Sequence, residues 1–421
     1  MLDIEYIRTH SDAVRRAIEQ KQVTLDLDEL LAVDAKRRQL IQQRDDLLAE
    51  RNRLSIEAAK ERGPAIKEAL AALEPELKSL ESQFSQLMLL VPQIPSPEAP
   101  VGGEAASVVL RTVGTPRHFD FAPKDHIELG TALDLLDLEA GVKVSGFRGY
   151  FLKNEAVLMH YGLMQLGLSL MRQRGFTLMV PPTIVRESAL VGSGHFPFGR
   201  AEVYQIGNAA RLEEENSKEQ HFLVGTAEPS LLDYYQDTTL DAVSLPIRMC
   251  GISQCYRSEA GSYGKDTRGL YRIHEFMKVE QVVIAPADDV LQDQLFHEML
   301  KIAEELLHML ELPYRILDIA TGDMGAGKVR MHDIETWMPS RHGYGETHSN
   351  SALGDWQARR LGLRYKGENG KKRYAYTLNN TVIASPRILV ALWENHQDAD
   401  GTIVVPAPLR TYVGTDRITR E

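Results

Sequence analysis

A seven-residue repeat of apolar side chains between Leu30 and Val91 constrains the fold of this chain more than any other feature. In its first half, Val33, Leu40, Leu47 and Leu54 recur every seven residues. In its second half the apolar residues follow alternating steps of four and three, at Ile66, Leu70, Leu73, Leu77, Leu80, Phe84, Leu87 and Val91. Such spacing puts one narrow apolar seam on a helix, as in coiled coils.

A turn is expected between the two halves, at Arg62-Gly63-Pro64, because proline is favoured at the first position of a helix. Pairing the halves about this turn sets Leu54 opposite Leu70 and Leu40 opposite Phe84. The pattern therefore predicts an antiparallel helical hairpin, roughly 45 Å long at about 1.5 Å per residue.

A hairpin with one narrow seam is mostly exposed, so it suits a dimerising coiled coil, a spacer or a binding arm. From Leu30 to Arg62 eight basic residues stand against six acidic ones, whereas only Lys67 and Lys78 are basic from there to Val91. A basic helix can follow a phosphate backbone, although mixed charge also occurs on solvated helices. The formal net charge of −11 means that any nucleic-acid contact must come from such a local patch.

Residues 92–103 contain four prolines and two glycines, a composition that forms semi-rigid linkers. We therefore predict an N-terminal domain over 1–103, with its arm at about 30–91, and a second domain over 104–421. In the second domain strands are expected at 222–224, 247–255, 278–285, 315–319, 332–338 and 374–378, and helices at 156–172 and 288–312. This order predicts an α+β fold with a mainly antiparallel sheet flanked by helices.

The N-terminus lacks the features of a signal or transit peptide, and no uncharged apolar run of about 18 residues occurs. A cytoplasmic protein is therefore expected. Cys250 and Cys255 have a spacing that is a poor zinc signal. We expect no zinc, and both thiols to be buried as small apolar side chains.

The densest group of chemically active residue types lies between Cys255 and Glu280. Read as two antiparallel strands, it places Arg257 and Glu259 on one face, because side chains alternate along a strand. Phe276, Lys278 and Glu280 likewise share a face. The joining loop is glycine-rich and basic, with Gly261, Gly264, Lys265, Arg268, Gly269 and Arg272. Arginine suits phosphate binding, yet a surface hairpin with cross-strand ion pairs explains the same residues.

A second anion site is predicted at Arg387. Ser385 suits an N-cap and Pro386 the first helical position, so Arg387 would lie in the first turn, beside unpaired backbone N–H groups. The helix macrodipole disfavours a cation at this end of a helix. An arginine there is therefore better explained by a function than by helix stability.

These segments together resemble the class II aminoacyl-tRNA synthetases, in the bacterial type of the seryl-tRNA synthetase family. Arg257-Ser258-Glu259 and the Phe276–Glu280 run resemble motif 2, and residues 175–181 resemble motif 1, which builds a dimer interface. Residues 225–228 resemble the serine-binding loop, 346–349 the ATP-side strand and 379–387 motif 3. The arm and the linker match as well, so the resemblance covers essentially 1–421.

The resemblance implies a homodimeric serine–tRNA ligase that uses ATP and Mg²⁺. It would activate L-serine to seryl-adenylate and charge serine tRNA, which has a long variable arm, and selenocysteine tRNA where present. Implied catalytic residues are Arg257, Glu259 and Arg387. The implied ATP-binding set is Arg257, Ser258, Glu259, Ile273, Phe276, Glu346, Thr347, His348, Ser349 and Arg387. The implied serine-binding set is Thr226, Ala227, Glu228, Glu280 and Thr381. Glu346 and Ser349 are the implied metal ligands, and Arg37, Arg44 and Arg51 the tRNA contacts.

Gly345 departs from the family pattern, which has arginine there. We expect either that Arg341 supplies the missing charge or that ATP binding is weaker. An arginine introduced at position 345 is then expected to tighten ATP binding. His195, His274 and His348 are expected to have structural roles, since this chemistry needs no imidazole. Two other functions stay open: a paralogue that loads serine onto a carrier, and a catalytically inactive RNA-binding homologue.

Overall fold

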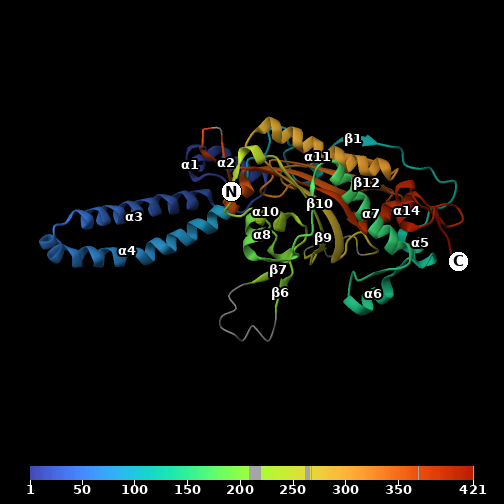
Figure 1. Ribbon diagram of the computed structural model, residues 1–421, viewed down its shortest axis with the longest axis horizontal. Helices are drawn as coiled ribbons and strands as arrows, with labels where there is room; N and C mark the ends of the chain where they lie inside the picture. The colour runs from blue at the N-terminus through green and yellow to red at the C-terminus, as the bar shows by residue number, and fades with distance from the viewer. Residues whose placement is uncertain (208–219, 261–265, 267, 368, 421) are drawn as a thin grey trace. The chain divides into compact units, whose positions relative to one another are not determined.

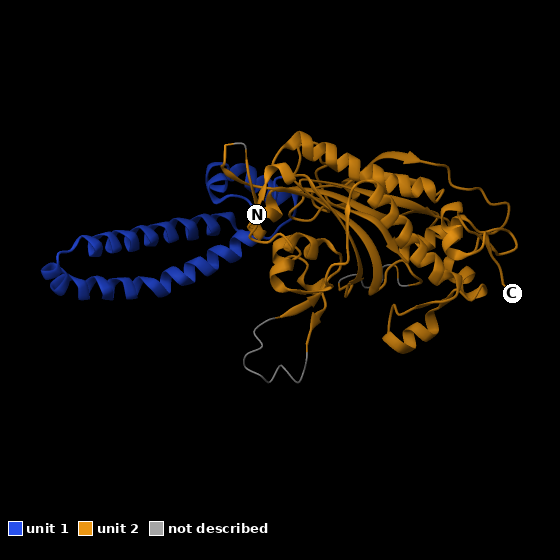
Figure 2. Cartoon of the chain, viewed as in Figure 1, with its two compact units in different colours: residues 1–94 blue, residues 95–421 orange. Residues whose placement is uncertain are grey.

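The computed structural model describes residues 1–207, 220–260, 266, 268–367 and 369–420. The chain divides into two compact units, residues 1–94 and 95–421, which Figure 2 shows in different colours. In the sequence this division falls inside the proline-rich segment. Gly261, Gly264 and Lys265 of the basic loop lie outside the described residues.

The first unit is all helical, with α1 Ile4–Thr9, α2 Ser11–Gln20, α3 Leu27–Arg53 and α4 Ile56–Leu90. Its two long helices form the predicted antiparallel hairpin (Figure 1). Near the base, α1 and α2 pack on both long helices through Ile7, Val14, Leu30 and Val91, all fully buried. Further out, Val33, Leu40, Leu77 and Leu80 form the seam.

The predicted position of the turn is wrong. α3 ends at Arg53, and Ser55 begins α4 by accepting a hydrogen bond from the backbone N–H of Ala58 at 3.3 Å. Gly63 and Pro64 lie inside α4. Arg62, expected at the turn, instead donates to Glu50 of the facing helix at 2.7 Å. The hairpin pairing is therefore shifted, and Leu54, which follows α3 in the turn, is not opposite Leu70.

The charge split between the two arm helices is smaller than predicted for the same reason. Lys60 and Arg62 belong to α4, not to the first helix. The implied tRNA contacts Arg37, Arg44 and Arg51 all remain on α3.

The second unit is built on an eight-stranded sheet with the order β1-β11-β12-β13-β16-β10-β9-β4. Every neighbouring pair is antiparallel except β4 and β9. In chain order the strands are β1 Val108–Val113, β4 Thr177–Met179, β9 Ile247–Tyr256, β10 Glu275–Ala285, β11 Tyr314–Asp318, β12 Arg330–Met338, β13 Gly343–Gly354 and β16 Tyr376–Ser385. The predicted α+β fold with a mainly antiparallel sheet is confirmed.

Helices α7 Glu155–Gln173 and α11 Asp289–Met309 pack on this sheet (Figure 1), and so does α13 Arg387–Asn395. Their buried Leu, Met and Val side chains form the main core. Among the described residues, the other α-helices of this unit are α5 His126–Ala132, α6 Leu138–Ser145, α8 Glu187–Ser193, α10 Glu228–Asp233, α12 Trp356–Leu361 and α14 Arg410–Val413. Short strands complete the unit: β2 Leu136–Asp137, β3 Phe151–Leu152, β5 Ile184–Arg186, β6 Gln205–Ile206, β7 His221–Leu223, β8 Thr239–Asp241, β14 Arg364–Lys366, β15 Lys372–Tyr374, β17 Ile403–Val404 and β18 Arg417–Ile418.

The alternation of side chains along the central strands separates structural from cavity-facing residues. Gln281 of β10, Asn350 of β13 and Asn380 of β16 donate hydrogen bonds to backbone carbonyls of α11 at 2.9–3.0 Å. Their neighbours Glu280 and Thr381 point to the opposite face, into a cavity. A one-residue slip in any of these strands would exchange the two sets.

Candidate active site

A cavity of about 310 Å³ lies against β10, β13 and β16 and the start of α13. Most of the residues that the resemblance selected line it: Thr226, Glu228, Arg257, Glu259, Ile273, Phe276, Glu280, Glu346, Thr347, Ser349, Thr381 and Arg387. Residues from 226 to 387 in sequence thus meet at one place. Three others from the same sets do not line it, namely Ala227, Ser258 and His348.

Those three side chains have other contacts. Ala227 is fully buried in an apolar cluster behind the cavity. The Ser258 hydroxyl donates to the carbonyl of Ala201 at 2.7 Å. His348 is buried with its Nε2 3.0 Å from the carbonyl oxygen of Val382, and burial lowers its pKa to about 4. These positions support the cavity walls.

Arg257 and Glu259 reach the cavity differently from the strand alternation that was predicted. β9 ends at Tyr256, so the shared-face argument does not apply, and Glu259 adopts a left-handed backbone with φ 53°. Glu259 accepts a hydrogen bond from Arg272 at 2.8 Å. The guanidinium of Arg257 lies 5.2 Å from the ring centre of Phe276 and donates to the carbonyl of Gly225 at 3.3 Å.

Arg387 lies in the first turn of α13, as predicted, but it is the first helical residue itself, and Pro386 is the N-cap instead. Ser385 is not the N-cap: it ends β16, and its hydroxyl lies 2.8 Å from Nδ1 of His160. Arg387 donates from Nε to the carbonyl of Tyr271 at 3.2 Å and from Nη1 to the carbonyl of Glu346 at 2.8 Å. Its guanidinium lies 4.5 Å from the centre of the Tyr271 ring. A cation beside a helix N-terminus forms an anion site.

Two buried carboxylates, Glu228 and Glu280, mark the other end of the cavity. Glu280 is 2.7 Å from the ammonium of Lys278 and accepts from the hydroxyl of Thr381 at 3.3 Å. Burial raises the pKa of Glu280 above its usual range, and Lys278 opposes that shift. The sequence pattern placed Lys278 on the same strand face as Glu280 but indicated no role for it. That the two side chains are buried together is not evident from the sequence alone.

Glu228 lies at the start of α10 and is bound by neutral amides. Gln357 donates to its Oε1 at 2.6 Å and Asn379 at 2.9 Å. Burial raises the pKa of Glu228, and the hydrogen bond from Gln357 opposes that shift. The sequence analysis placed Asn379 in the motif 3 segment without a role and did not single out Gln357, because an isolated amide in a sequence gives no signal of its partner.

Glu346 and Ser349 both line the cavity from β13, and Glu346 lies 3.5 Å from Arg387. Behind them Asp333 of β12 pairs with Ser349 across the ladder and is buried. Burial, and then the charge of Glu346, raise the pKa of Asp333 well above its usual range. One carboxylate and one hydroxyl supply oxygen ligands of the kind that Mg²⁺ takes, so Glu346 and Ser349 are the residues here that could hold such an ion.

His195 is the one residue among the three predicted structural histidines that lines the cavity. Burial, and then Arg257 and two lysines, lower its pKa to about 4, so the ring is neutral at pH 7. The loop Gly325–Lys328 also lines the cavity.

Gly345 leaves room for Tyr271. A Cβ at position 345 would lie 2.9 Å from Cε2 of Tyr271 and 3.0 Å from Sδ of Met338. Arg341, the expected substitute for the family arginine, does not line the cavity. It donates to Asp266 at 2.6 Å and lies 4.2 Å from the centre of the Tyr271 ring.

The implied tRNA contacts differ in their surroundings. The guanidinium of Arg37 lies 4.4 Å from the ring centre of Phe84 on α4 and 3.6 Å from Asp34. Arg44 bonds its neighbour Asp45, and Arg51 is exposed. Arg37 thus holds the hairpin together, whereas Arg44 and Arg51 face solvent more freely.

Comparison with known proteins places these features in one family. Residues 1–95 match the model of the seryl-tRNA synthetase N-terminal domain, and residues 211–396 match that of the tRNA synthetase class II core domain (G, H, P, S and T). A serine–tRNA ligase of Deinococcus radiodurans is 47% identical over 425 residues, with 98% of each chain covered. One of Nocardia farcinica is 42% identical over 428 residues, with 99% of each covered.

Solved structures agree with the sequence matches. The seryl-tRNA synthetase of Pyrococcus horikoshii, complexed with ATP, superposes with a TM-score of 0.90 at 32% identity, with all of both chains covered. The cytoplasmic serine–tRNA ligase of Naegleria fowleri, in complex with AMP, gives a TM-score of 0.88 at 27% identity, with 100% and 99% covered.

Proposed function

This chain belongs to the seryl-tRNA synthetase family of class II aminoacyl-tRNA synthetases, and from that premise we propose how its cavity works. The protein activates L-serine with ATP and transfers the seryl group to serine tRNA. One observation carries the proposal: two guanidiniums, an aromatic ring and two buried carboxylates converge on a single cavity.

The cavity has a nucleotide end and an amino-acid end. Arg257 binds the α-phosphate, Arg387 the terminal phosphate, and adenine stacks on Phe276. Glu228 and Thr226 hold the ammonium of serine, because a buried carboxylate favours a cation. Glu280 and Thr381 bind the serine hydroxyl, and a buried acceptor of this kind penalises an amino acid that lacks one.

Adenylate formation needs positioning more than covalent help. A carboxylate oxygen of serine attacks the α-phosphorus, the bond from that phosphorus to the bridging oxygen breaks, and pyrophosphate leaves with the electron pair. Arg257 and Arg387 neutralise charge on the two sides of the breaking bond. A terminal adenosine hydroxyl of the tRNA then attacks the seryl carbonyl carbon, and AMP leaves.

Glu346 and Ser349 would hold Mg²⁺ together with phosphate oxygens, and the ion would neutralise phosphate charge when bound. The donor set on β13 supports this assignment.

A homodimer is proposed from the motif 1 segment. Large apolar side chains are exposed in this segment and on the helix before it, with Val180 after β4 at 85% and Tyr161 of α7 at 55% of full exposure. Exposed apolar side chains of this size commonly mark a protein interface. Among the described residues no helix is long and apolar enough to span a membrane, and we place the enzyme in the cytoplasm, where charged tRNA is used.

Serine-dependent exchange of pyrophosphate into ATP, with and without serine tRNA, tests the proposal. Exchange with serine but not alanine, together with charging of the tRNA, is expected. Adenylate formation without tRNA charging would favour the carrier-loading paralogue. Absence of both reactions would favour the inactive RNA-binding homologue.

A further inference from the structure

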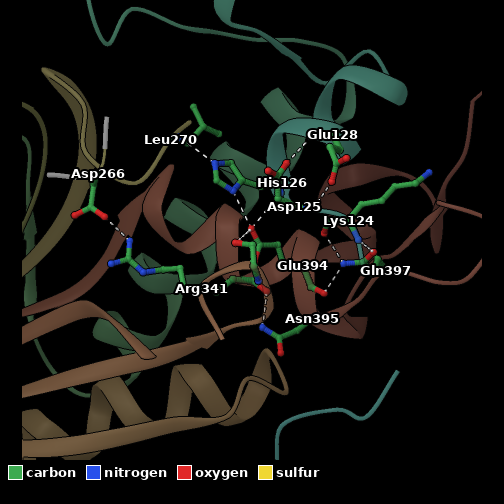
Figure 3. A network of polar contacts seen from close by, with 12 residues as sticks. Lys124, Asp125, His126, Glu128, Asp266, Leu270, Arg341, Glu394, Asn395 and Gln397 are labelled. Carbon is green, nitrogen blue, oxygen red and sulfur yellow. Dashed lines mark hydrogen bonds and ion pairs between the residues drawn. The ribbon is translucent and has the colours of Figure 1, made fainter. Parts of the chain in front are cut away.

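His126, the first residue of α5, connects Leu270, in the loop between β9 and β10, to the far end of α13 (Figure 3). Its ring Nδ1 lies 2.8 Å from Oε1 of Glu394, and its Nε2 lies 3.1 Å from the backbone nitrogen of Leu270. His126 is 7% exposed and Glu394 is fully buried. The ring therefore bridges two segments that are 124 residues apart in sequence.

The hydrogen-bond partners of the His126 ring determine which of its two nitrogens carries the proton. The backbone N–H of Leu270 can only donate, so Nε2 accepts and Nδ1–H donates to the carboxylate. Glu394 accepts three further hydrogen bonds, from the backbone N–H of His126 at 3.1 Å and from the N–H and hydroxyl of Ser340 at 2.9 and 2.8 Å. A carboxylate bound in this way holds the imidazole in one orientation.

Gly269 shows that the loop is fitted closely to the imidazole. It has φ +72°, and a Cβ there would lie 2.0 Å from Nε2 of His126. Only glycine allows both that backbone conformation and that approach.

Leu270 leads directly to Tyr271, which contacts Arg387. The Tyr271 carbonyl accepts from Arg387 at 3.2 Å, and the two side chains stack at 4.5 Å. The contacts therefore form a closed circuit, from Arg387 at the start of α13 through Tyr271, Leu270 and His126 to Glu394 near its end.

We propose that His126, held by Glu394, is a positioning residue that sets Arg387 for the terminal phosphate of ATP. It touches no substrate; it fixes the Leu270–Tyr271 backbone on which Arg387 rests. The inference rests on the proposed function, in which Arg387 binds that phosphate. It predicts that only nucleotides with a γ-phosphate bind more weakly, an effect that a general loss of packing would not give.

The test compares the binding of ATP and AMP to full-length His126→Phe and His126→Gln, with Arg387→Ala as reference. His126→Phe should weaken ATP binding about tenfold, the effect of losing roughly one hydrogen bond, and leave AMP binding within about twofold to threefold. Glutamine can accept from Leu270 and donate to Glu394, so His126→Gln should restore most of the ATP affinity. His396→Phe is the matched control. His396 directly follows α13; its Nε2 lies 2.9 Å from the carbonyl oxygen of Leu310, and it does not line the cavity.

The double variant His126→Phe/Arg387→Ala should bind ATP less than about threefold more weakly than Arg387→Ala alone. The two changes act on the same contact, the one between Arg387 and the phosphate, so their effects should not add. Equal losses for ATP and AMP, a fully additive double variant, or failure of the glutamine to restore ATP binding would each overturn the inference. If His126→Phe does not fold, the His126→Gln and Gly269→Ala variants give the same comparison, with Gly269→Ala expected to weaken ATP selectively. Lack of serine-dependent exchange in the parent, or ATP binding unaffected by Arg387→Ala, would instead count against the proposed function.

Discussion

Glu228 shows how a single buried charge can favour function over stability. Its direct hydrogen-bond partners in the cavity wall, Gln357 and Asn379, are neutral amides. Burial raises its pKa, so the folded protein binds a proton there more tightly than the unfolded chain. The stability associated with this group is present below the unfolded pKa, about 4.3, and is lost as pH rises through the folded value.

Glu228→Gln should therefore stabilise the protein at neutral and alkaline pH while weakening serine activation. A glutamine keeps an acceptor for both amides, and each tenfold change in the ionisation constant corresponds to about 1.4 kcal/mol. Urea unfolding at pH 5 and pH 8 should show a larger gain over the parent at pH 8, and the KM for serine should rise. A stability difference that is equal at the two pH values would contradict this assignment of the charge.

The position of Tyr271 changes the effect that is expected of an arginine at position 345. On sequence alone an arginine at 345 was expected to tighten ATP binding, but any side chain there meets the ring that supports Arg387. Gly345→Arg should raise the KM for ATP, by roughly tenfold if one charge-assisted contact is lost. Gly345→Ala should show part of the effect, because the collision begins at Cβ. Tighter ATP binding by the arginine variant would restore the original interpretation.

At the level of single elements, the apolar repeat predicted the arm correctly but could not place its turn. Gly63-Pro64 reads as a helix breaker, yet α4 continues through it and through Pro75. A proline within a helix removes one hydrogen bond, and on an exposed arm water can satisfy the free carbonyl. The turn lies where Ser55 caps the start of α4. Serine is too common in the sequence for this N-cap to be recognised in advance.

Strand β13 shows a related limit. Its sequence, Gly343–Gly354, is polar and glycine-rich, so alternation and propensity gave no strand there. It forms because β12 and β16 pair with it on both sides, a tertiary effect that overrides propensity. Only the family resemblance marked residues 346–349 as a strand beside ATP.

The surroundings of the arm arginines separate tRNA binding from arm stability. Arg44→Glu together with Arg51→Glu should lower tRNA charging about tenfold or more, with a loss that deepens as salt is added, because phosphate contacts are salt-dependent. Serine-dependent pyrophosphate exchange should not change. Lys67→Glu with Lys78→Glu, the same charge change on α4, is the control. An equal loss from both pairs would mean that net charge, not the α3 face, matters.

At the scale of the whole molecule, the candidate site was predictable only as a set of motifs. The residues that line the cavity all come from the second unit and span 193 to 387. Periodicity placed Phe276 and Glu280 on one face, but nothing in the sequence brings Glu228 to Asn379 or His126 to Leu270. Such contacts depend on the three-dimensional path of the chain, so sequence patterns within one segment do not contain them.

The division into two units predicts that the two reaction steps can be separated. Replacing residues 43–72 with a short Gly/Ser turn removes the outer arm but keeps the inner cluster of Val33, Leu40, Leu77 and Leu80. Pyrophosphate exchange should stay within a few-fold of the parent, since the cavity lies in the other unit, while tRNA charging should fall by orders of magnitude. Normal charging by the shortened protein would make the arm a spacer.

The strand order has a consequence for synthesis on the ribosome. β16 is the last strand of the large sheet to be translated, yet it lies between β13 and β10. A nascent chain that stops before residue 376 therefore has two half-sheets, β1-β11-β12-β13 and β10-β9-β4, each with an unpaired inner edge. Such edges promote aggregation. A premature stop in this gene should thus yield an insoluble product rather than a weakly active one.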